Sequence, residues 1–307
     1  MKLFSTYTLF GAILILGFNA CTEIGPEIAF GNGAESYDTT YVLPTVPTQE
    51  PRRVLIEEFT GASCTNCPAG HTTITNLESQ YPDRIIAIAY HKHGTSLDEP
   101  AGEGPFFEDT TKGDFRRREA NKIATEIYGD GVPNIPAAGI DRTINQNNGA
   151  PGYGTPQFLR NFWAPETDSR LTQPSYANMT MDIDYTPGDT FAMAHIVVTY
   201  TAAVSADQYL TVEILESKLV APQKYTNHLD THYVHNHVFR KLYTSPTIGQ
   251  QILKDVTIEP GRVFEAHMKL KLDDYWKKEN LTAVAFISVN DGTDRSVVQS
   301  VQAHVQP

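Results

Sequence analysis

The spacing of apolar residues changes near residue 173. Before that point, short apolar runs alternate with segments whose apolar side chains recur every three to four residues, as on one face of a helix. Strands that alternate with helices predict an α/β layered domain. The expected strands are residues 53–59, 84–90 and 137–141, and the expected helices are residues 69–81, residues 112–128 and a helix with Thr155 as its cap and Pro156 as its first residue.

After residue 173, apolar and polar residues alternate with a period of two, which is typical of half-buried strands. Turn-forming residues such as Pro187-Gly188 and Pro260-Gly261 separate the segments. About seven such strands predict an all-β sandwich of immunoglobulin-like architecture, with the boundary near Gln173-Pro174. The expected strands are residues 179–185, 191–201, 209–216, 237–243, 264–272, 281–289 and 296–305.

The N-terminus resembles an export signal. Lys2 supplies a positive end, and the apolar run at residues 9–16 is too short to span a bilayer. Phe18-Asn19-Ala20-Cys21 resembles a bacterial lipoprotein cleavage box, which predicts a signal peptide at residues 1–20 and lipidation of Cys21. An ordinary secretory signal or a simple membrane anchor are the alternatives. The polar, Gly- and Pro-containing stretch that completes residues 21–51 predicts a flexible tether.

Composition narrows the function classes. The chain has 307 residues, of which 40% are hydrophobic and 20% charged, as in ordinary globular proteins. Its net charge of -12 argues against nucleic-acid binding, which requires a basic surface. Three cysteines are too few for a disulfide-stapled scaffold. No phosphate-binding loop or serine-nucleophile motif is recognisable, and we expect no cofactor.

The candidate chemistry lies in Cys64-Thr65-Asn66-Cys67-Pro68, which follows a predicted buried strand and opens a predicted helix. A helix N-terminus stabilises a thiolate, so Cys64 is the candidate nucleophile and Cys67 the candidate resolving thiol of a redox pair. Pro68 lacks an N–H, so we expect the regular helix to begin near Asn66 or Cys67. The alternative is a static local disulfide.

The order strand, CxxC, helix, strand, helix, Ile-Pro, strand, helix resembles the thioredoxin-like fold. This resemblance covers residues 52 to about 172 and implies a thioredoxin-like domain at 52–173 before the β-sandwich domain at 174–307. It also implies a cis peptide at Ile135-Pro136, facing the cysteines and contacting the substrate backbone. Two departures are that Ala62-Ser63 replaces the usual Trp and that a proline follows the pair instead of separating it.

The combination of the lipoprotein signal, Glu58-Phe59-Thr60-Gly61, the CxxC pair and His235-Asn236-His237-Val238 resembles one family. It is named after a twenty-eight-kilodalton outer membrane protein of Gram-negative bacteria. The resemblance implies an outer-membrane lipoprotein on the periplasmic or cell-surface face, held by its lipid, with exported or surface proteins as partners. The family is described as having no settled biochemical role.

Histidines offer a weaker alternative. Four of them fall within residues 228–237, and a metal site there competes with a simple polar connection into the next strand. His91 and His93 end a predicted strand near the cysteines, where copper or zinc binding is a second alternative. His71 shares a helix face with Cys67, as a possible proton acceptor or a solvated side chain. The four clustered candidates are His228, His232, His235 and His237.

The leading functional hypothesis is thiol-disulfide exchange with exported proteins. Its rival is a non-enzymatic surface adhesion or scaffold lipoprotein that keeps a structural disulfide, and metal delivery is a minor third. An open groove beside the Cys64 sulfur would support protein substrates, whereas a covered sulfur would support the scaffold interpretation.

Overall fold

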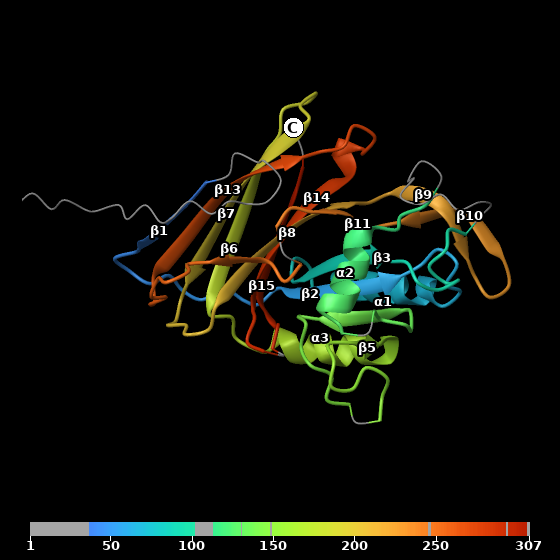
Figure 1. Ribbon diagram of the computed structural model, residues 1–307, viewed down its shortest axis with the longest axis horizontal. Helices are drawn as coiled ribbons and strands as arrows, with labels where there is room; N and C mark the ends of the chain where they lie inside the picture. The colour runs from blue at the N-terminus through green and yellow to red at the C-terminus, as the bar shows by residue number, and fades with distance from the viewer. Residues whose placement is uncertain are drawn as a thin grey trace, which may run out of the picture.

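The computed structural model describes residues 37–101, 113–129, 131–147, 149–244, 247–292 and 294–305. Over these residues the fold is mostly β, with few helices and several sheets (Figure 1). The expected signal peptide at residues 1–20 and the expected lipid-bearing Cys21 lie outside the described residues. Within the described segments, no helix combines the length and the apolar character that a bilayer crossing needs.

The largest sheet has nine strands and runs through both halves of the chain, in the order β15-β14-β8-β11-β3-β2-β4-β5, with β12 also paired to β8. The halves join where β11 pairs with β3 in parallel, at Val238 and Ala89. Its strands are β2 (Val54–Thr60), β3 (Ile85–His91), β4 (Ala137–Ile140), β5 (Phe158–Leu159), β8 (Gln208–Glu216), β11 (Val238–Leu242), β12 (Gln250–Ile252), β14 (Leu281–Val289) and β15 (Val297–His304).

A second sheet has four antiparallel strands in the order β1-β13-β7-β6. These strands are β1 (Tyr37–Val42), β13 (Arg262–Lys271), β7 (Phe191–Tyr200) and β6 (Ala177–Asp184). β1 falls within residues 21–51, where the sequence predicts a tether, yet residues 37–42 pair along β13 over their whole length. This part of the expected tether is therefore an edge strand of the fold.

Separate apolar cores pack against the two main sheets. Buried side chains of β6, β7 and β13 pack against those of β8, β14 and β15, so these strands form two facing layers. On β2 and β3, α1 (Cys67–Gln80) and α3 (Trp163–Leu171) cover one face, and α2 (Arg118–Glu126) covers the other. Figure 1 shows the helices gathered around this end of the large sheet, while strands alone form the opposite end.

The expected strands all appear, but two of the expected helices begin later than predicted. α2 begins at Arg118 instead of residue 112, because Arg117 is extended and its N–H donates to the His91 carbonyl at 3.0 Å. α3 begins at Trp163 instead of near Thr155, because Phe158 and Leu159 pair with β4 and a short 3-10 turn follows. In both places tertiary pairing overrides local helical spacing.

A third, two-stranded sheet forms a hairpin from β9 (Leu219–Lys224) and β10 (Leu229–His235). The sequence pattern did not predict β1, β5, β9, β10 or β12. The hairpin matters for function because it reaches from the second half of the chain to the loop that carries the cysteines, where the Lys224 N–H donates to the Ala62 carbonyl at 2.8 Å.

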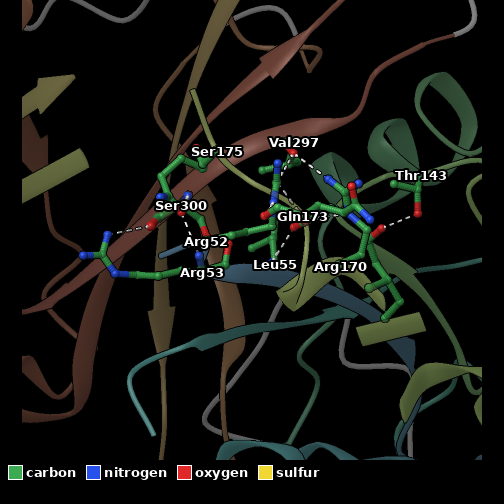
Figure 2. Close-up of polar contacts among 12 residues, drawn as sticks. Arg52, Arg53, Leu55, Thr143, Arg170, Gln173, Ser175, Val297 and Ser300 are labelled. Atoms are coloured by element: carbon green, nitrogen blue, oxygen red, sulfur yellow. Dashed lines mark hydrogen bonds and ion pairs between the residues drawn. The ribbon is translucent and has the colours of Figure 1, made fainter. Parts of the chain in front are cut away.

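Buried polar contacts tie the halves together around Arg52. Its guanidinium donates to Asp141 at 3.1 Å, to the Val297 carbonyl at 2.9 Å and to the Pro174 carbonyl at 2.9 Å. Arg170 donates to the same Asp141 carboxylate at 3.0 Å. Figure 2 shows Arg52 and Arg170 meeting beside Val297. These contacts and the shared sheet fix the α/β part against the strands that follow it.

Candidate functional site

The two cysteines lie in the turn between β2 and α1 and form a disulfide with a Cα–Cα distance of 5.4 Å. α1 begins at Cys67, with Asn66 as its N-cap and Pro68 in its first turn, as the sequence predicts. Cys64 stands before the helix, and its N–H donates to the Gly61 carbonyl at 3.0 Å. The pair therefore sits at the amino end of a 14-residue helix.

The Ile135-Pro136 segment lies beside this pair. The Ile135 carbonyl oxygen is 3.7 Å from the Cys64 Sγ atom, and the Ile135-Pro136 peptide bond is cis, as the resemblance implies. Pro136 also faces α1, because a Cβ added to Gly70 would stand 3.3 Å from the Pro136 Cβ. The structure thus brings Cys64, Cys67, Ile135 and Pro136 together.

The disulfide is covered. Cys64 is 2% exposed and Cys67 is 0% exposed. From β9, the Gln223 side-chain amide donates to the carbonyls of Gly61 at 3.3 Å and Cys64 at 3.0 Å. From another side, Ser63 Oγ donates to the Pro100 carbonyl at 3.3 Å. Among the described residues, the hairpin and the loop at residues 95–101 cap the cysteine turn instead of leaving an open groove.

Sequence reasoning missed Glu58, which lies on β2 behind the cysteine turn. Its side chain is 1% exposed and its Oε1 has no hydrogen-bond partner. Burial raises the pKa of Glu58 well above its usual value, which favours the neutral carboxyl. A Cβ at Gly70 would come within 2.6 Å of Glu58 Oε1, so glycine is needed where α1 crosses this carboxyl. The available signal was a pair of adjacent glutamates in a strand that is buried throughout.

His71 of α1 lies beside Glu58, with 3.6 Å between His71 Nε2 and Glu58 Oε2. Its ring is also hydrogen-bonded to Thr60 Oγ1 at 3.0 Å and to the Tyr233 hydroxyl at 2.6 Å. Burial, followed by the charges of His235 and His237, lowers the pKa of His71 to about 3. His71 is therefore a neutral hydrogen-bonding group that links β2 and α1 to the hairpin.

The four histidines of the second half do not converge. His228 stacks on Tyr225, His232 is exposed beside Thr231, and His237 pairs with Glu78 of α1 at 3.2 Å. Over the described residues, no group of three or more His, Cys, Asp or Glu side chains has a spacing suited to a metal ion.

His235 is the one member of that set whose ring enters the interior, where it lies 5.9 Å from the His91 ring and 4.8 Å from the Phe115 ring. Burial lowers the pKa of His235 to about 4 and lowers the pKa of His91 well below its usual value. Both rings are therefore neutral at pH 7 and act as packing groups under the hairpin.

These features define a mostly β protein with a disulfide held at a strand-to-helix turn. The family model described as outer membrane protein Omp28 matches residues 131–307, more than half of the chain, and the chain therefore belongs to this family. This confirms the resemblance drawn from the sequence and supports an outer-membrane location. No curated protein matches the sequence.

Several solved structures share the fold, and two of them are compared with this chain. HBP35 of Porphyromonas gingivalis has a TM-score of 0.60 and 16% sequence identity, over 84% of this chain and 77% of that one. A protein of Agrobacterium tumefaciens has a TM-score of 0.50 and 11% identity, over 84% of this chain and 97% of that one. At these identities the likeness concerns the fold alone.

Proposed function

We propose that the chain is an outer-membrane-anchored lipoprotein whose thioredoxin-like part, residues 52–173, exchanges disulfides with exported proteins. Residues 174–307 form an immunoglobulin-like sandwich that holds this part in place. One observation carries the proposal: Cys64 lies just before the amino end of α1, and its Sγ atom is 3.7 Å from the Ile135 carbonyl oxygen. The family membership and the fold shared with HBP35 support the surface-lipoprotein setting.

In the reducing direction, the Cys64 thiolate attacks one sulfur of a substrate disulfide. A mixed disulfide forms and the first substrate thiolate leaves. The Cys67 thiolate then attacks Cys64, which closes the Cys64–Cys67 bond and releases the second substrate thiolate. Two electrons pass to the substrate, and the disulfide described here is the oxidised product of this cycle. Ile135 and Pro136 contact the substrate backbone beside Cys64.

A second candidate is a non-enzymatic scaffold with a structural disulfide. The burial of both cysteines beneath the hairpin and the loop at residues 95–101 favours this candidate. Exchange with a protein substrate requires these caps to move away from Cys64, whereas a structural disulfide requires nothing to move.

The reduction potential separates the candidates. We expect an exchange-competent pair to lie between about -270 and -120 mV, and a structural pair to lie below about -300 mV. Equilibration of the full chain with glutathione or dithiothreitol buffers, followed by alkylation and mass analysis, gives this value for Cys64 and Cys67.

Insulin reduction in the presence of dithiothreitol tests the activity. Wild type should accelerate it and Cys64→Ser should not. Cys67→Ser serves as a second variant, which should accumulate a mixed disulfide with the substrate. Equal rates for wild type and Cys64→Ser, with both variants melting as cooperatively as wild type, would leave only the scaffold candidate.

The lipid anchor is tested separately. Cys21→Ser should move the mature chain from the membrane fraction to the soluble fraction of cells, because a short apolar signal without a lipid gives no stable attachment. Membrane retention of Cys21→Ser would contradict lipidation and would favour the simple membrane anchor.

A further inference from the structure

A cavity of about 200 Å³ lies beneath α1, behind the cysteine turn. Its floor is the middle of β3, one wall is the second and third turns of α1, and the other wall is the end of β10 with the turn that follows. On this face of the sheet β3 presents the small side chains of Ala87 and Ala89, which leave room beneath α1. β3 also meets β11 at a single residue pair there, so the sheet does not fill the gap.

The cavity has an apolar side and a polar side. Ile74, Ala87 and Val234 supply apolar surface, while Glu58, Thr75 and Tyr233 supply oxygen atoms. A cavity of about 150 Å³ is enough to hold benzene, so this one has room for an aromatic ring with a short polar substituent. It is smaller than the pockets that hold drug-sized ligands, which start at about 300 Å³.

Two hydroxyl groups on the α1 wall already use their hydrogens within the helix. Thr72 and Thr75 donate their hydroxyl hydrogens to the carbonyls of Pro68 and His71, both at 3.0 Å, so they offer lone pairs to any further partner. Glu58 contributes a buried Oε1 without a hydrogen-bond partner. No lysine or arginine belongs to the described residues that line this cavity. A ligand that brings a positively charged hydrogen-bond donor to Glu58 would therefore supply the partner that this oxygen lacks.

We propose that this cavity binds a small organic ammonium ion, with its apolar body against Ile74, Ala87 and Val234 and its ammonium group donating to Glu58. The positive charge favours the ionised carboxylate, so binding should lower the proton occupancy of Glu58. Charge-assisted hydrogen bonds to a buried carboxylate are about twice as strong as neutral ones, which selects the cation over a neutral ligand of the same shape. This site is independent of thiol chemistry at Cys64.

Three probes of one shape and different charge test the proposal: benzylammonium, benzyl alcohol and benzoate. In isothermal titration of the full chain at pH 7, we expect saturable binding of benzylammonium at one site and at least about tenfold weaker binding of the other two. Repeating the titration in buffers of different ionisation enthalpy should show net proton release when benzylammonium binds. A water-filled cavity with no ligand specificity predicts no saturable binding of benzylammonium, and that result would overturn the proposal.

Two variants locate the site. Glu58→Gln keeps the side-chain shape and should weaken benzylammonium binding at least about tenfold and abolish proton release. Ala87→Val fills the cavity while leaving Glu58 in place, and should weaken binding as well. Melting curves without ligand establish that both variants fold. Unchanged affinity in a folded Glu58→Gln variant, or benzyl alcohol binding as tightly as benzylammonium, would place the binding elsewhere and refute the assignment.

Discussion

Glu57 and Glu58 are neighbours on β2 with opposite environments. Both side chains are buried, but they point to opposite faces of the sheet. On the α2 face, Glu57 accepts two hydrogen bonds from Arg142, both at 2.7 Å, and one from the Tyr128 hydroxyl at 2.7 Å. On the α1 face, Glu58 has an oxygen without a partner and a neutral histidine beside the other. One carboxylate is fully compensated and the other is not.

The difference shows that the two faces of this α/β layer have different roles: one carries a buried ion pair that contributes to stability, and the other carries a candidate binding site. The Glu57 face contains the buried ion pair between Glu57 and Arg142, and Arg142 has an unusual backbone conformation. Directly after β4, Asp141 and Arg142 adopt positive φ angles of 47° and 52°, which non-glycine residues rarely do. These angles direct Asp141 to Arg52 and Arg142 to Glu57. No such cation is directed at Glu58, where the structure leaves a cavity instead.

The largest expected effect comes from breaking the compensated pair. Glu57→Gln leaves the Arg142 guanidinium buried without a counter-ion, and we expect a loss of about 3–5 kcal/mol in the free energy of unfolding. Chemical denaturation monitored by circular dichroism measures this loss. A change below about 1 kcal/mol would mean that Arg142 finds another partner or reaches solvent. That result would contradict the claim that the Glu57 face contributes more to stability than the Glu58 face.

The sequence predicts most of the strands because their cause is local. The alternation in residues 264–272, for example, reflects one buried face of β13, and the continuous run at 84–90 reflects burial of β3 on both faces. β1 and the β9–β10 hairpin were missed, because their order comes from pairing with strands far along the chain. The continuity of the large sheet through both halves depends on the β11–β3 contact, which no local pattern encodes.

A second prediction concerns Glu213, which joins the same buried group on the α2 face. The Tyr90 hydroxyl donates to both its oxygens at 2.9 Å. Burial and the nearby Glu57 raise the pKa of Glu213 from 4.5 to about 8. Between these values the unfolded chain has lost a proton that the folded chain retains, so stability falls as pH rises, by about 1.4 kcal/mol per pH unit.

Glu213→Gln should remove this contribution, so its free energy of unfolding should fall less steeply than that of wild type from pH 5 to 8. Urea titrations at four pH values in that range provide the measurement. Glu279→Gln, at an exposed position, is the control and should keep the wild-type slope. Identical slopes for wild type and Glu213→Gln would show that Glu213 is ionised in the folded protein.

Only part of the candidate site could be predicted from the sequence. The spacing of Cys64 and Cys67, and the place of Pro136 in the order of elements, identified the residues that the structure brings together. The hairpin that covers the cysteines could not be predicted, because Gln223 lies about 160 residues later in the chain. Glu58 was equally hidden: the sequence shows two adjacent glutamates in a strand, and only packing shows which has a cation.

The third prediction reverses the sign of the first. Glu58→Gln removes a carboxyl whose pKa burial raises in the folded state and that ionises more readily in the unfolded chain. We therefore expect a gain in the free energy of unfolding at pH 7 that is smaller at pH 4, where the unfolded glutamate is also largely protonated. Denaturation at both pH values measures it. A loss as large as that of Glu57→Gln would show that Glu58 is ionised and compensated like its neighbour.

The smallest effect is expected at the link between α1 and the hairpin. Tyr233→Phe deletes the hydroxyl that is hydrogen-bonded to His71 at 2.6 Å, and should cost about 0.5–1.5 kcal/mol, because a buried ring nitrogen loses its partner. Tyr37→Phe on β1, where the ring is 57% exposed, is the matched control and should change stability by less than about 0.5 kcal/mol. Since the hydroxyl ties the hairpin to the helix that begins at Cys67, Tyr233→Phe should also speed reduction of the disulfide by dithiothreitol. Equal reduction rates in both variants would show that the hairpin holds its place over the cysteines without this hydrogen bond.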